Sequence, residues 1–359
     1  MLATEVMIAD APKDESEHAH MPSGGGMEGM GMQAIRLHSL SRVRGGFMKG
    51  LIIIALIAAL SLPATPVRAA DCDRACLESL MNRYLAALDA HDAKQLPLAR
   101  GAKFTENTVA LTLGDGFWQT IDKGSQSSTS RLIIADPATS QVAFYGAATE
   151  NGHGVLFGVR LKHKAQRISE IEQFVVRRGP AQIGEFDHPT AYDAAWTEVL
   201  PANERLPRSE LVRIANLYFE GIERSSGDII PLVPETSRVE NGFRTAPRPP
   251  GADGKPAQSI RETFNSGMFQ YIREIKPRRF LLVDEERGVV YAMVMFQHPG
   301  NVTGLPMWDK QYKDPTSIIV YPNSMAMTES FRIRGGKITH IVAQMVMLPY
   351  RQPTGWPAP

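Results

Sequence analysis

The chain has 359 residues, of which 39 are basic and 38 are acidic, so its formal net charge is +1. This balance excludes a strongly basic nucleic-acid-binding surface, and we expect no nucleic-acid partner. Without its first 70 residues, the chain is long for one domain and of comfortable length for two.

The first 70 residues differ from the rest in their pattern. A basic start at residues 48–50 precedes an apolar run over 51–62 and a small-residue ending at 67–69. This order is typical of a secretory signal peptide over 48–69, which makes 1–47 a mis-assigned start or a disordered leader. The apolar run is short for a membrane span, and a retained anchor is the alternative. We therefore expect a periplasmic or secreted protein with no membrane attachment after signal cleavage.

The two cysteines, Cys72 and Cys76, lie four residues apart just after this segment. On a helix this spacing places the two α-carbons about 6 Å apart, which is within the range of a disulfide. An exported protein also meets an oxidising compartment. We expect a Cys72–Cys76 disulfide that pins the first helix. The alternative is a redox pair, for which C-x-x-x-C is not the usual spacing.

The remainder of the chain contains an internal repeat. Residues 84–107 reappear without gaps as residues 218–241, so that Tyr84 matches Tyr218 and Glu106-Asn107 matches Glu240-Asn241. Each pair is 134 positions apart (218 − 84), a period that indicates a duplicated domain rather than a solenoid. We place the first domain at 70–200 and the second at 201–359.

Each half begins with an amphipathic helix, because apolar residues recur at helical spacing over 77–88 and over 211–222. The rest of each half is rich in β-branched and aromatic residues and is divided by turn signals. We expect strands at residues 104–113, 131–135, 141–149, 155–163 and 168–177, and at 279–284, 289–297, 324–334 and 338–348. One helix followed by antiparallel strands is an α+β pattern.

The last two strands of each half also match each other, now with an offset of 170 positions (338 − 168). The additional 36 positions (170 − 134) indicate insertions in the second copy, for which 245–256 and 298–315 are the candidates.

These motifs resemble a known family. The segments FTEN…LGDGFW, RLKHK…ISEIE, RVENGF and LPYRQPTGW are similar to those of an exported family of unknown function with tandem nuclear transport factor 2-like (SnoaL-like) domains. The resemblance covers nearly all of residues 71–359. It implies two tandem cone-shaped α+β domains, each a curved, mostly antiparallel sheet packed on helices. It also implies a fused pair that packs sheet against sheet, as homodimers of this superfamily do, with a further dimer possible.

The cone implies a pocket inside the curved sheet, so polar residues on its apolar inward face become candidates. Glu329 shares a strand face with Met325, Met327, Phe331 and Ile333, and Glu172 shares one with Ile168, Phe174 and Val176. A desolvated carboxyl can act as a general acid or base near neutral pH. The alternative for each is a structural ion pair with Arg160 or Arg332, or a position at the rim of the pocket.

His340 is the candidate partner of Glu329 across a hairpin, because histidine titrates near neutral pH. We group it on one strand face with Ile338, Val342, Gln344 and Val346. The alternative is a satisfied histidine in the core or at the rim.

Four further residues are candidates for ligand binding. Trp118 and Trp308 can form aromatic walls or anchor loops, and Glu240 and Asn241 can lie at a pocket mouth. Retention of the Glu-Asn pair in both copies favours a structural role for it, since Asn suits tight turns. The spacing of potential ligands supports no metal site, and the sequence contains no cofactor-binding motif.

Two functions remain open. One is a cofactor-independent isomerase, dehydratase or lyase that transfers a proton on a small hydrophobic or aromatic molecule, with Glu329 as the base, His340 as its partner and Glu172 as a weaker candidate. The other is a non-catalytic module that binds a small ligand or a protein. A fold of this kind hosts many functions, so the fold does not decide between them.

Overall fold

The structure is a computed structural model, which describes residues 72–122, 124–125, 130–179, 184–247, 259–302 and 321–357. These residues belong to one unit, Pro66–Pro359. The leader at 1–47, the signal peptide at 48–69 and Trp308 lie outside the described residues, so those expectations stay predictions.

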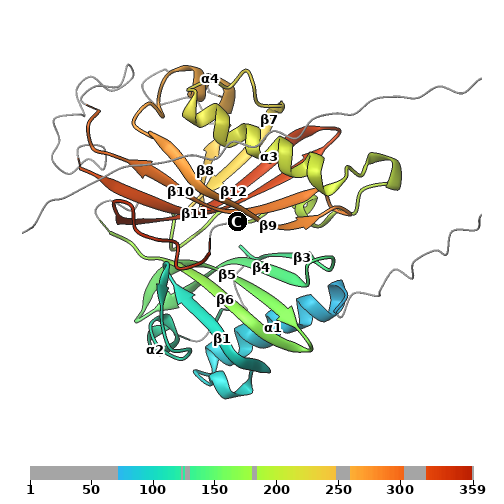
Figure 1. Cartoon of the computed structure of the whole chain (residues 1–359), viewed down its shortest axis with the longest axis vertical. Helices are drawn as coiled ribbons and strands as arrows, with labels where there is room; N and C mark the ends of the chain where they lie inside the picture. Colours follow the sequence, from blue (N-terminus) through green and yellow to red (C-terminus); the bar gives the residue numbers. More distant parts are fainter. Residues whose placement is uncertain are drawn as a thin grey trace, which may run out of the picture. The chain divides into compact units, whose positions relative to one another are not determined.

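Two halves with the same order of elements make up this unit (Figure 1). The first half contains α1 (Arg74–Asp89), η1 (Ala93–Gln95), β1 (Leu98–Glu106), β2 (Val109–Ala110), α2 (Phe117–Thr120), β3 (Leu132–Asp136), β4 (Gln141–Glu150), β5 (His153–Lys164) and β6 (Arg167–Val176). Two short helices follow, η2 (Ala194–Thr197) and η3 (Ala202–Glu204). The second half contains α3 (Arg208–Glu223), β7 (Leu232–Glu240), β8 (Phe243–Ala246), α4 (Ile260–Asn265), β9 (Glu274–Asp284), β10 (Val289–His298), β11 (Asn323–Arg334) and β12 (Lys337–Pro349).

Each half folds into a six-stranded sheet, and the two sheets have the same topology. The strand orders are β2-β1-β6-β5-β4-β3 and β8-β7-β12-β11-β10-β9. Within each sheet one neighbouring pair is parallel, β1 with β6 and β7 with β12, and the other pairs are antiparallel. The predicted α+β class and tandem arrangement are therefore confirmed, while the boundary at residue 200 stays a prediction.

The first strand of each half is where the sequence prediction was weakest. The expected strand at 104–113 lies partly beyond β1, which ends at Glu106, and no strand was expected at β7. Both strands carry charged residues, and β7 contains Pro234, so neither shows the apolar alternation typical of a strand. They pair with β6 and β12, which lie far away in the sequence, so local sequence patterns do not predict this pairing.

The described apolar residues form three cores, one within each half and one between the halves. One core packs α1 against the first sheet, and another packs α3 and α4 against the second. The third lies between the two sheets and draws residues from both, including Tyr145 and Tyr291, whose ring centroids are 5.7 Å apart. Figure 1 shows α1 and α3 on the faces that the sheets turn away from each other. Each sheet thus has one face on its own helix, which is the cone interior, and one face on the other sheet.

Two equivalent ion pairs connect the halves, each between the first helix of one half and a strand of the other. Arg74 at the start of α1 binds Asp284 at the end of β9, with nitrogen–oxygen distances of 2.7 and 2.8 Å. Arg208, the equivalent residue of α3 (74 + 134), binds Asp136 at the end of β3 at 2.7 and 2.8 Å. Such reciprocity is the signature of a two-fold interface between like subunits, here within one chain.

We expect Arg208→Met to lower the free energy of unfolding by about 2 kcal/mol in a urea titration. It leaves Asp136, which is 1% exposed, without its cation. The Arg208 side chain is 33% exposed, which keeps the effect below that of a fully buried pair. Arg213→Met is the control, because its pair with Glu210 is exposed and should contribute less than about 0.5 kcal/mol. Equal effects of the two substitutions would contradict the assigned role of the Arg208–Asp136 pair.

The predicted disulfide is present at the start of α1. Cys72 and Cys76 are bonded, with their α-carbons 5.3 Å apart. Asp73 lies between them as the N-cap, and its side chain accepts a hydrogen bond from the Cys76 amide. The bridge and the cap together hold the first turn of the helix.

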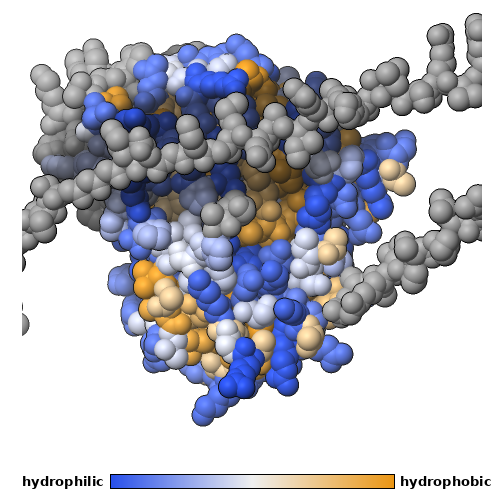
Figure 2. Space-filling model, in the orientation of Figure 1, coloured by the Kyte–Doolittle hydropathy of each residue, from blue (hydrophilic) through white to orange (hydrophobic). Residues whose placement is uncertain are grey.

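Hydrophilic residues cover much of the face shown in Figure 2, with hydrophobic residues interspersed among them. Among the described large apolar residues, Val109, Val199, Phe243 and Tyr321 are the most exposed, at 50–57%. In the described part of the chain, no helix has the length and apolar character that crossing a membrane requires.

Candidate functional site

Glu329 lies in the interior of the second cone. It stands in the middle of β11, and Met327 and Phe331 on the same face of the strand belong to the core beneath α3. Its exposed fraction is 0%, and among the described residues neither carboxyl oxygen has a hydrogen-bond partner. A buried polar group without a partner is uncommon in proteins and calls for an explanation. Both oxygens of this carboxyl lack a partner among the described residues.

Three further polar side chains surround Glu329. Tyr218 of α3 receives a hydrogen bond at its hydroxyl from Arg238 Nη1 of β7, over 3.1 Å. The Nε of Arg238 lies 3.2 Å from a carboxylate oxygen of Glu240 on the same strand. The Tyr218 hydroxyl lies close to the Glu329 carboxyl without forming a hydrogen bond of ordinary geometry. We call these four residues the second-cone cluster: Tyr218, Arg238, Glu240 and Glu329.

Burial controls the charges of this cluster. Loss of hydration, reinforced by the negative charge of Glu240, raises the pKa of Glu329 well above its ordinary value, although Arg238 and Tyr218 partly offset the rise. Burial likewise raises the pKa of Tyr218. Burial works against the charge on Arg238, but Glu240 and Tyr218 outweigh it, so the pKa of Arg238 stays above its usual value. The cluster thus presents the Glu329 carboxyl, with its raised pKa, and the Tyr218 phenol beside the Arg238–Glu240 ion pair.

This arrangement can donate protons to a ligand. Since Arg238 donates to the Tyr218 oxygen, the Tyr218 proton is free to point onward, and the protonated Glu329 is a second donor. Apolar rings enclose the pair: the centroid of the Tyr218 ring is 5.1 Å from that of Phe331 and 5.2 Å from that of Phe264. In such a low-dielectric setting, a carboxyl with a raised pKa can exchange a proton near neutral pH.

The first cone has the same backbone fold, but different side chains occupy its interior. Tyr84, the counterpart of Tyr218, donates from its hydroxyl to the Gln173 side chain over 2.8 Å and accepts a hydrogen bond from the Trp118 indole over 3.2 Å. Gln173 in turn donates to Glu106, which also accepts from the Phe117 amide. The exposed fraction of Trp118 is 0%. The first-cone polar groups therefore bond to one another, and Trp118 is part of the core.

The residues that set the second cone apart were only partly predicted. By the two offsets of the repeat, Arg238 stands where the first copy has Phe104 (238 − 134), and Glu329 stands where it has Val159 (329 − 170). The pairing registers agree, because Val159 faces Gln173 and Glu329 faces Ala343, again 170 apart. Glu329 was proposed from its apolar strand face, whereas Tyr218 and Arg238 were missed. A comparison of the two copies at Phe104 and Arg238 contains the signal for the latter.

The expected pairing of His340 with Glu329 is wrong. His340 stands opposite Arg332 in the ladder, whereas Glu329 stands opposite Ala343. His340 lies on the face turned toward the first half, where its Nδ1 is 3.0 Å from the Thr339 hydroxyl and its ring packs against Trp196 at 6.0 Å. Burial lowers the pKa of His340. The residue that accompanies Glu329 is Tyr218, from the helix.

Glu172 also lies outside the cone interior, contrary to the expectation. Its carboxylate faces the second sheet and accepts hydrogen bonds from Arg160 at 3.0 and 3.1 Å and from Arg279 at 2.7 and 3.2 Å. Its neighbours Phe174 and Val176 belong to the core between the sheets. Two buried arginines neutralise Glu172, which is the structural ion pair that the sequence left open as the alternative.

The repeated asparagines hold strands together. Asn241 and Asn107 both have positive φ, 43° and 46°, just after their strands. The Asn241 side chain accepts from the Met345 amide over 2.9 Å, and Asn107 accepts from the Val175 amide over the same distance. Each asparagine thereby extends the parallel pairing by a side-chain bond, which is the structural role favoured by its retention in both copies. Glu240 is the member of that motif that reaches the second-cone cluster.

The described residues hold no group of three or more His, Cys, Asp or Glu side chains that could bind a metal ion.

The topology defines the class of protein. Each half packs a helix against a six-stranded curved sheet, and each sheet has one parallel strand pair at the same place. This is the α+β cone of nuclear transport factor 2-like proteins. Within that class, residues 204–345 match the family model described as "Domain of unknown function (DUF8021)". The resemblance found in the sequence, to a family without an assigned function, is confirmed.

Solved structures with similar folds include the epoxide hydrolase/cyclase-like enzyme SalBIII, which is 15% identical, with 40% of this chain and 97% of that chain covered and a TM-score of 0.27. AusH from Aspergillus nidulans is 13% identical, with 39% and 86% covered and a TM-score of 0.25. A de novo designed protein with a curved β-sheet is 12% identical, with 39% and 88% covered and a TM-score of 0.26. No curated protein matches the chain. Likenesses this distant carry no activity over to this chain.

Proposed function

We propose that the second cone is a proton-transfer site for a small hydrophobic molecule, and that the protein is a cofactor-independent isomerase, dehydratase or lyase. The observation that supports this most strongly is Glu329, a fully buried carboxyl without a hydrogen-bond partner among the described residues. Burying such a group destabilises the fold, and this cost is typical of residues that are retained for a function. Its position beside Tyr218 and Arg238, and the rise in its pKa, are those of a general acid.

The proposed step returns its proton. The protonated Glu329 delivers a proton to the bound molecule, which leaves a carboxylate, and that carboxylate then takes a proton back from another position of the same molecule. No net proton is consumed in an isomerisation. The Arg238 guanidinium stabilises the transient carboxylate, and the Tyr218 hydroxyl donates a hydrogen bond to a substrate oxygen and so holds the molecule in place. A molecule with a carbonyl or hydroxyl group on an apolar skeleton suits these donors and the surrounding rings.

Hydrogen–deuterium exchange into the ligand provides a test that does not require the product to be known. Small aromatic and terpenoid compounds that raise the melting temperature are incubated with the protein in D₂O, and loss of C–H signals is followed by NMR. We expect Glu329→Gln to slow catalysed exchange by about 10²–10⁴-fold, which is the usual contribution of a general acid or base. Glu235→Gln, at an exposed position of the same half, is the matched control.

The result of this exchange assay distinguishes a proton-transfer enzyme from a non-catalytic binding module. Exchange that continues unchanged in Glu329→Gln would refute the assignment of Glu329. Ligands that bind with equal affinity to both forms, without exchange in either, would support the non-catalytic binding module instead.

We also infer that the protein is exported. The Cys72–Cys76 disulfide supports an oxidising compartment. The signal peptide at 48–69 and the periplasmic or secreted location are part of this proposal.

A further inference from the structure

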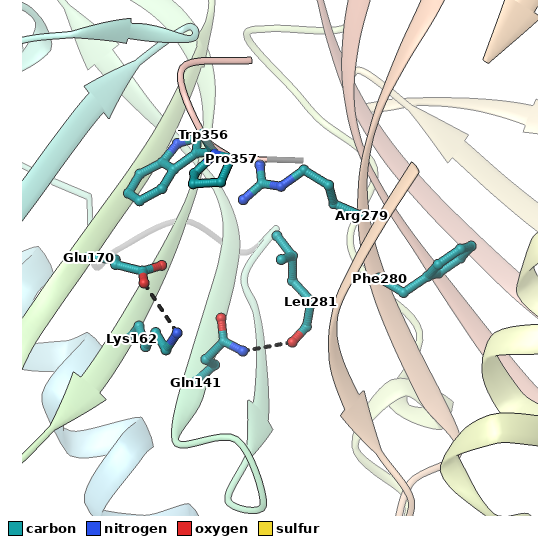
Figure 3. Close-up of a pocket in the computed structure, with 8 residues that line it drawn as sticks. All are labelled: Gln141, Lys162, Glu170, Arg279, Phe280, Leu281, Trp356 and Pro357. Atoms are coloured by element: carbon teal, nitrogen blue, oxygen red, sulfur yellow. Dashed lines mark hydrogen bonds and ion pairs between the residues drawn. The ribbon is translucent and has the colours of Figure 1, made fainter. Parts of the chain in front are cut away.

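A cavity lies between the two sheets, and none of the residues of the second-cone cluster lines it. Its volume is about 230 Å³, which is smaller than the 300–1,000 Å³ typical of sites for drug-sized ligands. It is lined by Gln141, Lys162, Glu170, Arg279, Phe280, Leu281, Trp356 and Pro357. Figure 3 shows Lys162 and Glu170 projecting from the first sheet and Arg279 from the second, with Trp356 and Pro357 beside them. The walls therefore come from both halves and from the C-terminal segment.

Buried polar side chains form part of the wall. Arg279 is 6% exposed and Gln141 is 7% exposed. Gln141 is held in place, because it donates to the Leu281 carbonyl over 2.8 Å and accepts from Arg160 over 2.8 Å. Glu172 accepts from two of the five N–H donors of Arg279 and the Met293 sulfur accepts from a third, which leaves two donors of this buried guanidinium for a ligand. Lys162 gives one donor to Glu170 over 3.2 Å and has two more.

Positive charge is in excess around the cavity. Six charged side chains line it or contact the residues that do: Lys103, Arg160, Lys162, Arg279, Glu170 and Glu172. Four are cations and two are carboxylates, so this group carries a net charge of +2 (4 − 2). Partial burial makes such an excess unfavourable without a counter-charge. An anion in the cavity would supply one.

Trp356 gives the cavity an apolar, aromatic wall. Its indole donates to the Thr105 hydroxyl over 3.0 Å, and Lys103 donates to the carbonyl of Gly355. Gly355 has a φ of +76°, and a side chain there would collide with the Thr108 carbonyl oxygen. The segment is therefore held against β1. The Lys103 ammonium and the Arg160 guanidinium stand over the ring, 4.4 and 5.1 Å from its centroid.

We propose that this cavity binds a small organic carboxylate, with Arg279 and Lys162 pairing with its charge and Trp356 and Leu281 packing against its apolar part. The volume restricts the ligand to a few heavy atoms beyond the carboxylate. Cations and an aromatic wall together favour a small aromatic acid over a bare inorganic anion. This site is independent of the proton-transfer chemistry proposed at Glu329.

Sodium benzoate is the probe, and its affinity is measured by isothermal titration calorimetry at 50 and 500 mM NaCl. We expect saturable binding that weakens at high salt, since screening reduces charge pairing. Lys162→Gln should weaken it about tenfold, the usual effect of losing a charge-assisted contact. Trp356→Ala should weaken benzoate but not inorganic phosphate. Benzamide, which has the same shape without the charge, should bind at least tenfold more weakly.

Two variants serve as controls. Lys164→Gln removes an exposed lysine of the same strand, and Glu235→Gln alters an exposed position of the second half, so both should bind benzoate as the wild type does. The side chain of Lys162 is 40% exposed, so its replacement by glutamine should preserve the fold, which circular dichroism checks. The proposal is overturned if benzoate does not bind, if phosphate binds as tightly as benzoate, or if Lys162→Gln and Lys164→Gln behave alike.

Discussion

Replacing Glu329 with methionine should raise the free energy of unfolding at pH 8 by about 1–3 kcal/mol, the cost of burying a polar group without a partner. Methionine matches Met325 and Met327 on the same face of β11 and is similar in volume to glutamate. Most substitutions in a core destabilise. A higher free energy of unfolding for Glu329→Met would show that the wild-type glutamate destabilises the fold.

The pH dependence has a definite sign. The folded-state pKa of Glu329 is raised above the ordinary value of 4.5, mainly by burial. Between these two pKa values the folded protein binds more protons than the unfolded chain, so stability falls as pH rises. The contribution of Glu329 is fully present below pH 4.5 and is lost as pH rises toward the raised pKa. The gain from methionine should therefore be smaller at pH 5 than at pH 8.

Urea titrations of the wild type, Glu329→Met and Glu329→Gln at several pH values between 5 and 9 test this. Both variants should have flatter pH profiles than the wild type, while Glu235→Gln should follow it. A wild-type profile that matches that of Glu329→Gln would contradict the raised pKa. Combined with the exchange assay, the expected pattern is lower activity together with higher stability, the trade-off typical of functional sites.

Glu172→Ala should have the opposite effect and lower the free energy of unfolding by about 3–5 kcal/mol. The substitution leaves Arg160 and Arg279, with side chains 0% and 7% exposed, without the carboxylate that bridges them. These two arginines come from different sheets, so the loss falls on the packing between the halves. Thermal or urea unfolding of the variant provides the measurement.

A double-mutant cycle with Arg279→Met isolates the interaction. Removing both partners should destabilise less than the sum of the two single changes, by about 0.5–3 kcal/mol, because neither charge is then left buried alone. Additive effects would show that Glu172 and Arg279 are not coupled. If Glu172→Ala instead retained full stability and lost proton exchange, Glu172 and not Glu329 would be the acid.

The sequence was informative wherever the two copies could be compared. The repeat gave the duplication, the two helices and the motif that ends in Asn107 and Asn241. The apolar face of β11 identified Glu329. The partners of Glu329 could not be found in the same way, because Tyr218 and Arg238 come from other elements and meet it only in the folded cone. Contacts between elements far apart in the chain leave no periodic signal.

Irregular pairing explains the two misplaced residues. The ladder shifts register between Arg332 and Ile333 and again between Ile338 and His340, so Ile338 and Ile341, not His340, share the cone interior. A matching shift next to Lys162 separates Glu172 from Ile168. One added residue moves every later side chain to the other face. The alternation of apolar and polar residues along a sequence does not reveal such bulges.

Covalent fusion of the two cones has a consequence for how ligands should be counted. In a dimer of identical subunits, a substitution appears in both sites at once. Here Trp118 could occupy one interior while Arg238 and Glu329 arose in the other, without either change being copied to its counterpart. The expected stoichiometry in the cones is therefore one ligand per chain, not two. Because the linker keeps the halves at high effective concentration, that ratio should not change on dilution.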